Sequence, residues 1–317
     1  MHGERCFYKL FNFCGKPSFC GLVVLFVCEG VWKVFGSTVA LAGVDVVFEG
    51  RGFHFLLGPN GSGKSTLLRL FSGLLKPSRG KVSVFGFDPW RFRDRVCSRV
   101  CFVFEDVGLP WWFSGKDFLR FVVSVSRSSW ERMVDIARRL GVDGFWDKSI
   151  RGYSTGMRKK LLLAAGIGRE CEAYVFDEPF SGLDVASIGV VLGLLEELAR
   201  DHLVLVTTHI GFRVPSELTR SVVVLVGGKV VFTSSSIGQE CFVCSRDTLD
   251  QVYEAVRGSR ELLLDISGKE ILVCAQGANL EHLGCKSVLD PIAVYESVMR
   301  NLSSTIPGSN PTTIAGH

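Results

Sequence analysis

The sequence of 317 residues has no run of five or six basic residues and no long apolar segment. Lys and Arg number 36 against 32 Asp and Glu, a formal net charge of +4, and the basic residues are dispersed. This charge gives no reason to expect nucleic-acid binding. The longest apolar candidate, Phe19 to Cys28, ends at Glu29 and is shorter than the roughly 18 apolar residues that a transmembrane helix needs. We therefore expect a globular chain that does not cross a bilayer.

The chain also lacks the cysteine pattern of a secreted, disulfide-linked protein. Its 11 cysteines are odd in number and irregularly spaced, so we expect most of them to act as small core residues. Cys241 and Cys244 form a single C-x-x-C motif in a short apolar stretch. Without a second pair, this motif does not predict a metal or redox site.

The length exceeds what one hydrophobic core usually holds, so we expect a large domain over residues 21–236 and a smaller one over 241–302. Leu22 to Cys28 is expected to be the first strand. Lys9 and Lys16 precede it, but no small-residue cleavage site of a signal peptide follows. Residues 1–20 are then either an extension or the product of an upstream start codon, and residues 303–317, rich in Ser, Thr, Pro and Gly, are expected to be disordered.

The strongest motif is a glycine-rich segment between a predicted strand, Phe53 to Leu57, and a predicted helix. The helix is marked by apolar residues at helical spacing, namely Leu67, Leu70, Phe71 and Leu74. The motif itself consists of Gly58, Pro59, Asn60, Gly61, Ser62, Gly63, Lys64, Ser65 and Thr66. It matches the phosphate-binding loop at every required position, which makes a simple glycine-rich turn the weaker alternative. Backbone N–H groups and Lys64 would bind a triphosphate at the helix N-terminus, and Ser65 would ligate magnesium.

The order of predicted elements around this loop is that of an α/β fold. Strands are expected at Val39 to Glu49, Lys81 to Phe85, Ala173 to Phe176 and Leu203 to Thr207, with a helix marked by Ile188, Val191, Leu195 and Leu198. Residues 109–169 have helical periodicity instead, with Ser128 and Glu131 as a capping box and Gly141 as a helix stop. We therefore expect a parallel sheet with an inserted helical subdomain.

The segment 241–302, which follows an apolar stretch from Ser221 to Phe232, predicts a small α+β domain. Strands are expected at Leu262 to Ile266 and Ile271 to Cys274, and a helix is marked by Leu249, Val252 and Val256. A last helix is expected to begin at Asp290, as N-cap, and Pro291.

Two adjacent acids, Asp177 and Glu178, end the predicted strand at Ala173 to Phe176. Ligands of open α/β sheets bind at the carboxyl ends of the strands. Asp177 could therefore hold magnesium, and Glu178 could polarise a water for attack on the γ-phosphate. Two exposed acids at a strand end are the alternative, which the nearby phosphate-binding loop disfavours.

Further motifs follow in the order found in ATP-binding-cassette (ABC) ATPases, which residues 22 to about 235 resemble. Tyr153 to Met157 resembles the signature sequence of that family, Ser181 to Asp184 resembles its D-loop, and Thr207-Thr208-His209 its switch histidine. Phe35 stands where the family stacks an aromatic ring on adenine. Ser154 and Gly156 can also offer a hydroxyl and a backbone N–H to an anion at a helix start, although the segment alone predicts only a capped helix.

The resemblance implies a P-loop NTPase fold that hydrolyses ATP with Mg²⁺. It implies a head-to-tail dimer, either homodimer or heterodimer, in which one subunit's phosphate-binding loop and the other's signature hold each ATP. The implied catalytic residues are Lys64, Glu178 and His209, the implied metal ligands are Ser65, Asp177 and Glu105, and the further nucleotide-binding residues are Phe35, Ser154, Thr155, Gly156 and Asp184. Three positions depart from the family pattern: Thr155 replaces glycine, Met157 replaces glutamine, and Glu105 replaces the glutamine that reaches the magnesium.

The implied function is that of the ATPase subunit of a transporter, peripheral at the cytoplasmic face of the cell membrane and driving a separate membrane-spanning permease. The segment Asp290 to Tyr295 resembles the appended domain of type 2 ABC exporters, which favours export. One alternative is a soluble ABC-type ATPase acting on ribosomes or DNA. The chain has one cassette, and the segment between Lys64 and Asp177 is too short for a long coiled coil. Both observations disfavour this alternative. A nucleotide binder without turnover would lack Glu178 or His209.

Overall fold

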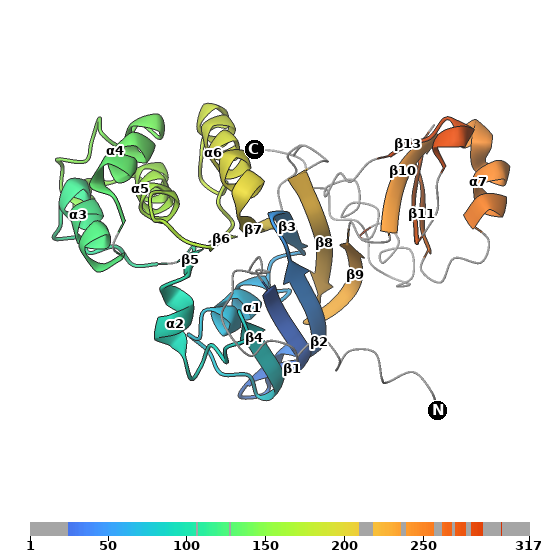
Figure 1. The fold of residues 1–317 in the computed structure, drawn as a ribbon, viewed down its shortest axis with the longest axis horizontal. Coiled ribbons are helices and arrows are strands. Elements are labelled where there is room, and N and C mark those ends of the chain that lie inside the picture. Colours follow the sequence, from blue (N-terminus) through green and yellow to red (C-terminus); the bar gives the residue numbers. More distant parts are fainter. Residues whose placement is uncertain are drawn as a thin grey trace, which may run out of the picture.

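The computed structural model describes residues 25–105, 107–126, 128–208, 218–235, 239–256, 262–267, 270–276, 280–287 and 299. These residues form three sheets with helices between and beside them (Figure 1). Several expectations lie outside the described residues: the extension 1–20, His209, the helix start at Asp290 and Pro291, and the tail 303–317.

The central sheet has six strands in the order β5-β6-β7-β3-β8-β9. Their bounds are Val100–Val103 (β5), Ala173–Asp177 (β6), Leu203–Thr208 (β7), Gly52–Leu57 (β3), Thr219–Val226 (β8) and Lys229–Ser235 (β9). All neighbours pair in parallel except β9, which is antiparallel to β8. Strands β3, β6 and β7 are buried along their whole length, which explains why they appear in the sequence as nearly continuous apolar runs. The expected parallel sheet is confirmed.

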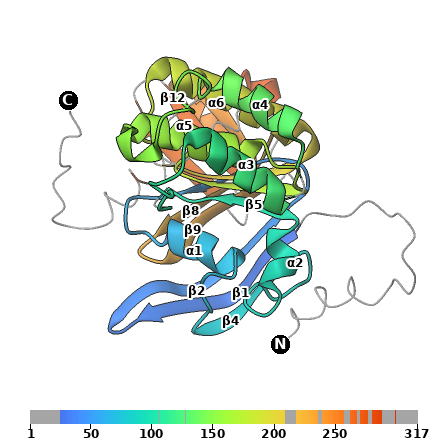
Figure 2. The ribbon, with the colours of Figure 1, turned by 90° about the vertical axis from the view of Figure 1, so that its left-hand side faces the viewer.

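A second, antiparallel sheet has the order β2-β1-β4. The bounds are Leu25–Phe35 (β1), Thr38–Glu49 (β2) and Arg79–Val84 (β4). Helix α1 (Lys64–Phe71) lies between this sheet and the central one (Figure 2), and the Phe26 and Phe71 rings meet edge to face with centroids 5.2 Å apart. Strand β1 continues seven residues beyond the expected end at Cys28, because its second half pairs with β2 up to the turn at Gly36. Helix α1 ends before Leu74, which is exposed.

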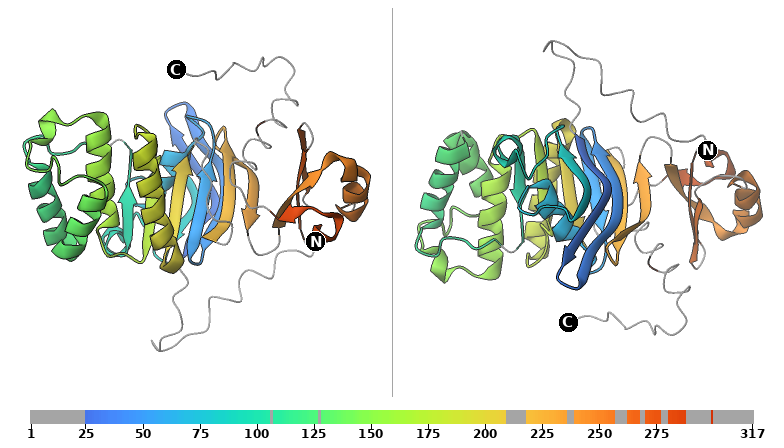
Figure 3. Two further views of the ribbon diagram at one scale, coloured as in Figure 1. Left: turned by 90° about the horizontal axis from the view of Figure 1, so that it is seen from above. Right: turned by 90° about the horizontal axis from the view of Figure 1, so that it is seen from below.

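On the side of the central sheet opposite α1, helix α6 (Val185–Asp201) packs against β3 and β7. Helices α3 (Gly115–Ser126), α4 (Trp130–Arg139) and α5 (Thr155–Ile167) form a group beyond the β5 edge, with α5 next to β5 (Figure 3). A short helix, α2 (Arg93–Cys97), precedes β5. The expected cap of α4 is wrong by one residue. Ser129 is the N-cap and accepts from the Arg132 N–H, whereas the Ser128 hydroxyl accepts from the Glu170 N–H. The expected stop is confirmed, since Gly141 has a φ of +67°, which favours glycine.

The third sheet has the order β11-β12-β10-β13 and lies beyond β9, at the end of the molecule away from α3 to α5 (Figures 1 and 3). Its elements are β10 (Gln239–Ser245), α7 (Leu249–Val256), β11 (Leu262–Ser267), β12 (Glu270–Gln276) and β13 (Lys286–Ser287). The sheet and α7 share a hydrophobic cluster that includes Phe242, Val252 and Val273.

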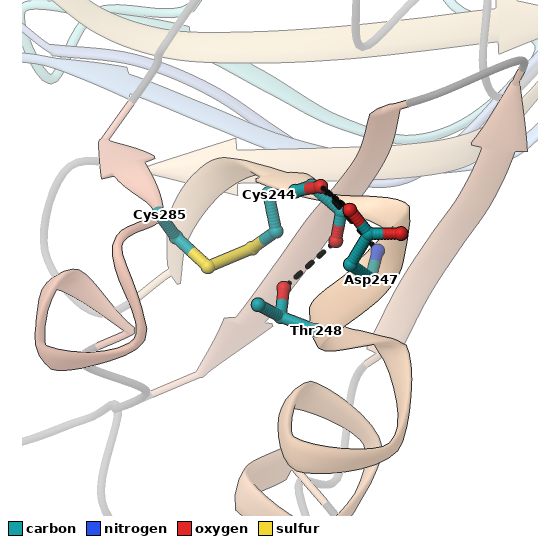
Figure 4. Close-up of a disulfide and its surroundings, with 5 residues drawn as sticks. Cys244, Asp247, Thr248 and Cys285 are labelled. Atoms are coloured by element: carbon teal, nitrogen blue, oxygen red, sulfur yellow. Dashed lines mark hydrogen bonds between the residues drawn. A yellow bond between two sulfur atoms is a disulfide. The ribbon is translucent and has the colours of Figure 1, made fainter.

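A disulfide in this third sheet joins Cys244 to Cys285 (Figure 4). The sequence spacing gave no sign of it, because the two cysteines are 41 positions apart. Beside the bond, the Thr248 hydroxyl donates to the Ser245 carbonyl at 2.7 Å. The two cysteines of the C-x-x-C motif are therefore not bonded to each other, since Cys244 forms its disulfide with Cys285. Cys28, Cys101 and Cys171 are buried free thiols, in line with the expectation of core cysteines.

Candidate functional site

The phosphate-binding loop joins β3 to α1 and packs between two neighbouring strands. A Cβ at Gly63, whose φ is +107°, would lie 2.6 Å from the Ala40 carbonyl of β2. A Cβ at Gly58 would overlap the Leu225 carbonyl of β8. Glycine is therefore required at both positions, because any side chain would push the loop off these strands. Helix α1 begins at this loop without a side-chain cap, so its first N–H groups have no capping partner from a side chain.

Lys64, the first residue of α1, is buried and held by three acceptors. Its ammonium donates to the Gly58 carbonyl at 2.7 Å and to the Pro59 carbonyl at 3.4 Å. It also lies 3.4 Å from Oε1 of Glu178, and both side chains are buried. The structure therefore brings together the lysine and the glutamate that the sequence assigned to catalysis.

Glu178 follows β6 in a strained backbone conformation. Its φ is +48°, a left-handed value that side-chain-bearing residues seldom adopt. The strain is held by two hydrogen bonds from the Glu178 N–H, to the Thr207 carbonyl at 3.2 Å and to Thr207 Oγ1 at 3.0 Å. The turn directs the Glu178 side chain toward the phosphate-binding loop rather than along the strand.

Asp177, the last residue of β6, accepts a hydrogen bond from Thr207 Oγ1 at 2.7 Å. Burial raises the pKa of its carboxyl group above the usual value. Hydrogen bonds from Thr207 and Ser65 oppose this rise, and the negative charges of Glu178 and Glu105 add to it. Three acidic groups therefore influence one another here, and a bound cation would relieve their repulsion.

A cavity of about 180 Å³ lies between the phosphate-binding loop, Glu105 and Glu178. It is lined by Ala40, Asn60, Gly61, Ser62, Gly63, Lys64, Ser65, Thr66, Glu105 and Glu178. Glu105, two residues beyond β5, thus reaches the same space as the phosphate-binding loop. The described residues contain no group of three His, Cys, Asp or Glu side chains placed to hold a metal on their own. Magnesium in nucleotide sites commonly takes only one or two carboxylates and completes its shell with phosphate oxygens and water.

Other predicted site residues lie apart from this cavity. Ser154 caps α5 and accepts from the Met157 N–H at 3.2 Å, and Thr155 and Gly156 open that helix. Asp184 caps α6 and accepts from the Ser187 N–H at 2.8 Å. Phe35, at the end of β1, is 46% exposed, and the Lys33 ammonium lies 4.8 Å from its ring centroid. None of these five lines the cavity at the phosphate-binding loop of the same chain.

The roles of two residues near the site were not predicted from the sequence. Thr207 holds both Asp177 and Glu178, a role that no local pattern shows. Lys159, on α5, is buried and lines a second cavity of about 500 Å³ together with Glu105. Burial lowers the pKa of Lys159, and the charges of Glu105, Asp177 and Glu178 oppose the shift. In the sequence Lys159 stands within Arg158-Lys159-Lys160, which looks like an exposed basic run.

Comparison with known proteins agrees with this geometry. The family model described as ABC transporter matches residues 41–181. The ABC transporter ATP-binding protein NatA of Bacillus subtilis is 29% identical over 224 residues, covering 69% of this chain and 85% of that protein. The cytochrome c biogenesis ATP-binding export protein CcmA of Methylococcus capsulatus is 31% identical over 57% of this chain and 89% of its own length. The chain belongs to the ABC transporter ATP-binding family.

Other relatives in this ABC family differ in named role and length. The probable sulfate/thiosulfate import ATP-binding protein CysA of Chlorella vulgaris is 30% identical over 66% of this chain and 90% of that protein. The chain spans about half the length of two further curated relatives (53% and 51%). The structure of an ATP-binding subunit of an ABC transporter matches with a TM-score of 0.61 at 24% identity, over 67% of this chain and 90% of that one, and so shows the fold.

The P-loop NTPase core of ABC type is thereby established, and the chain is an ATP-binding, ATP-hydrolysing subunit of an ABC transporter. Subunits of this family dimerise and act with membrane permeases. Among the described residues, no helix is both long and apolar enough to cross a membrane.

Proposed function

We propose that this subunit hydrolyses ATP in the cavity between the phosphate-binding loop and Glu178, and that its dimer drives export through a separate membrane-spanning permease. The observation that carries the proposal is the convergence of Lys64, Glu105 and Glu178 on one cavity at the carboxyl ends of parallel strands. Export rests on the expected last helix, at Asp290, and on the export role named for CcmA.

The phosphate-binding loop fits a triphosphate. The N-terminus of α1 has no side-chain cap, and the buried Ser62 hydroxyl has no hydrogen-bond partner in the part of the chain that the structure describes. Both observations leave donors for an anion. Lys64 would exchange its carbonyl partners for phosphate oxygens, and the backbone from Gly58 to Thr66 would wrap the β- and γ-phosphates.

The donor set also fits Mg²⁺. Ser65, Asp177 and Glu105 offer the hard oxygen atoms that this ion prefers, and burial, with a smaller effect of the charges of Glu178 and Glu105, raises the pKa of Asp177. The ion would supply positive charge to the phosphates. Glu105 adds a carboxylate where the family usually has an amide, so we expect this site to depend strongly on its metal.

Glu178 is proposed as the general base. Its strained backbone and the two hydrogen bonds from its N–H to Thr207 fix the start of the side chain, and Lys64 lies 3.4 Å from Oε1. A carboxylate held in this way can accept a proton from a water placed between it and the terminal phosphate. His209, two residues after Thr207, is proposed as the switch histidine.

The residues outside the cavity are proposed to act across a head-to-tail dimer, either homodimer or heterodimer. Ser154, Thr155 and Gly156 lie at the N-terminus of α5, where N–H groups and the Ser154 hydroxyl can bind the phosphates of the partner subunit's nucleotide. Asp184 lies at the N-terminus of α6, next to the same interface. Phe35 is proposed to stack on adenine, because its ring is exposed at the end of β1.

We propose that the permease docks beside the 500 Å³ cavity. Val107, Trp111 and Trp112 carry large exposed apolar side chains at this place, and Val107 and Trp111 also line the cavity. Exposed aromatic residues beside a cavity are typical of protein interfaces. The subunit would then be peripheral at the cytoplasmic face of the membrane, with residues 241–302 coupling or regulating rather than catalysing. We expect no nucleic acid as a partner.

The test is phosphate release by purified full-length protein and by Glu178→Gln. The variant should lose about 10² to 10⁴-fold in turnover while still binding ATP, the usual contribution of a general base. Glu49→Gln, at the exposed end of β2, is the matched control and should keep parental turnover. Near-parental turnover of Glu178→Gln would overturn the assignment.

A further inference from the structure

Two free cysteines lie in contact at the edge of the central sheet opposite the nucleotide site. Cys101 is on β5 and is 1% exposed, and Cys171 comes two residues before β6 and is 8% exposed. The Cys101 thiol donates to the Gly166 carbonyl of α5 at 3.3 Å, and the Cys171 side chain interacts with it in the same hydrophobic cluster. The mechanism proposed above uses neither of them.

Positive charge surrounds this pair. The Arg169 guanidinium donates to the Cys97 carbonyl at 3.0 Å and interacts with both thiols. Arg132 donates to the Ile167 carbonyl at 3.3 Å. The Nε atoms of both arginines are buried, and neither has a hydrogen-bond partner in the part of the chain that the structure describes. An ionised sulfur would give these donors an acceptor.

The two thiols have opposite character. The neighbouring Cys101 thiol, which could turn its S–H toward an ionised Cys171, lowers the pKa of Cys171, and Arg169 and Arg132 act in the same direction against burial. The interaction with Cys171, and then burial, raise the pKa of Cys101 well above the usual value, so Cys101 stays a thiol that donates to the Gly166 carbonyl. One thiolate beside one thiol is the arrangement of an attacking and a resolving cysteine.

Cys171 can be reached from solvent through a cavity of about 220 Å³. The cavity is also lined by Arg99, Arg132, Glu172, Tyr174 and His202. Its walls are ordered by the Arg99–Glu172 ion pair, at 2.6 and 2.7 Å, and by the Tyr174 hydroxyl, which donates to the Arg169 carbonyl at 2.8 Å and accepts from the Cys171 N–H at 3.2 Å. The cavity gives a small molecule a route to Cys171, whereas Cys101 is buried and does not line it.

We propose that Cys171 is a modification site that reacts with low-molecular-weight disulfides, and that Cys101 resolves the adduct. The Cys171 thiolate attacks one sulfur of the small disulfide, a mixed disulfide forms, and one small thiolate leaves. The Cys101 sulfur then attacks Cys171 Sγ, the Cys101–Cys171 bond forms, and the second small thiolate leaves with the Cys101 proton. Two protein thiols are oxidised and one small disulfide is reduced to two thiols.

The product would link β5 to the segment before β6. The Cys101 thiol would lose its hydrogen bond to Gly166, a residue of the helix that begins at the signature segment. Oxidation at this edge would therefore alter the support of α5 without touching the nucleotide cavity.

The test uses reduced full-length protein exposed to hydroxyethyl disulfide at neutral pH. The reaction is quenched with acid, free thiols are alkylated, and peptides are analysed by mass spectrometry. Cys171 should react on the order of tenfold faster than Cys97, which is half-buried and whose pKa is raised by burial. The parent protein should end as the Cys101–Cys171 disulfide, and Cys101→Ser should accumulate the mixed disulfide on Cys171.

Cys97→Ser is the matched control. It should leave unchanged both the rate at which Cys171 reacts and the formation of the Cys101–Cys171 disulfide. If Cys101→Ser fails to fold, the parent protein alone decides, through the order of labelling and the cross-linked peptide. Labelling of Cys171 no faster than Cys97, or a stable mixed disulfide on Cys171 in the parent, would overturn the proposal.

Discussion

His54 should make the stability of the fold depend on pH in a window that can be calculated. It lies on β3, the strand that leads into the phosphate-binding loop, and it is 1% exposed. Its Nδ1 lies 2.7 Å from the Ser221 hydroxyl, and its ring meets Phe48 edge to face. Burial lowers its pKa from 6.5 to about 4, against a smaller opposing effect of the hydrogen bond to the Gly50 carbonyl.

The direction of the pH effect on stability follows from this lowered pKa of His54. Between pH 6.5 and 4 the unfolded chain binds a proton at His54 and the folded chain does not, so acid favours unfolding. The stabilising contribution is fully present above pH 6.5 and is lost as pH falls toward 4. Between pH 7 and pH 5 the loss is about 2 kcal/mol, taking 1.36 kcal/mol per pKa unit and the incomplete titration at both ends.

The assay is urea unfolding of the parent and of His54→Gln at pH 7, 6 and 5. The glutamine can still form hydrogen bonds but does not titrate, so the loss of stability toward pH 5 should be smaller in the variant by about 2 kcal/mol. All other titrating groups are shared and cancel in the difference. Equal pH dependence in the two proteins would refute the reasoning, whatever their absolute stabilities.

Three further predictions concern the nucleotide site. Asp177→Asn should raise the midpoint of thermal unfolding of the nucleotide-free protein in chelator, because burial raises the pKa of this acid and its ionised form is costly at neutral pH. A lower midpoint in calorimetry would contradict this. Glu105→Gln should reduce the ratio of ATP affinities with magnesium and with chelator while turnover at saturating magnesium stays within roughly tenfold, and an unchanged ratio would remove Glu105 from the metal ligands. Phe35→Ala should weaken ATP binding by about 1 to 3 kcal/mol in titration calorimetry without unfolding the exposed β1–β2 turn, and unchanged affinity would point to Trp32 instead.

Local patterns predicted the elements that carry the site. The phosphate-binding loop, the strand ending at Asp177 and the helical insertion each have a periodicity or a motif confined to neighbouring residues. The ends of helices and strands were predicted less accurately where contacts with other segments determine them. Strand β1 extends to Phe35 because β2 returns beside it, and Ser129 rather than Ser128 caps α4 because Ser128 instead bonds the Glu170 N–H.

Contacts between distant segments were not available from the sequence. Thr207 supports both Asp177 and Glu178 from the next strand, and Lys159 faces acidic groups from a helix whose local sequence looks exposed. The cysteine partners Cys244 and Cys285 meet only because β10 and β13 pair. Such pairs depend on the register of strands, which no motif encodes.

The ion pair between Lys64 and Glu178 means that the site carries its own counter-ion before any nucleotide arrives. An incoming anion must compete with a carboxylate that is already in place 3.4 Å from the ammonium. A small anion such as inorganic phosphate brings little charge and few contacts to that competition, whereas a triphosphate brings more charge and also engages the uncapped start of α1. We therefore expect inorganic phosphate to compete poorly with a triphosphate for Lys64.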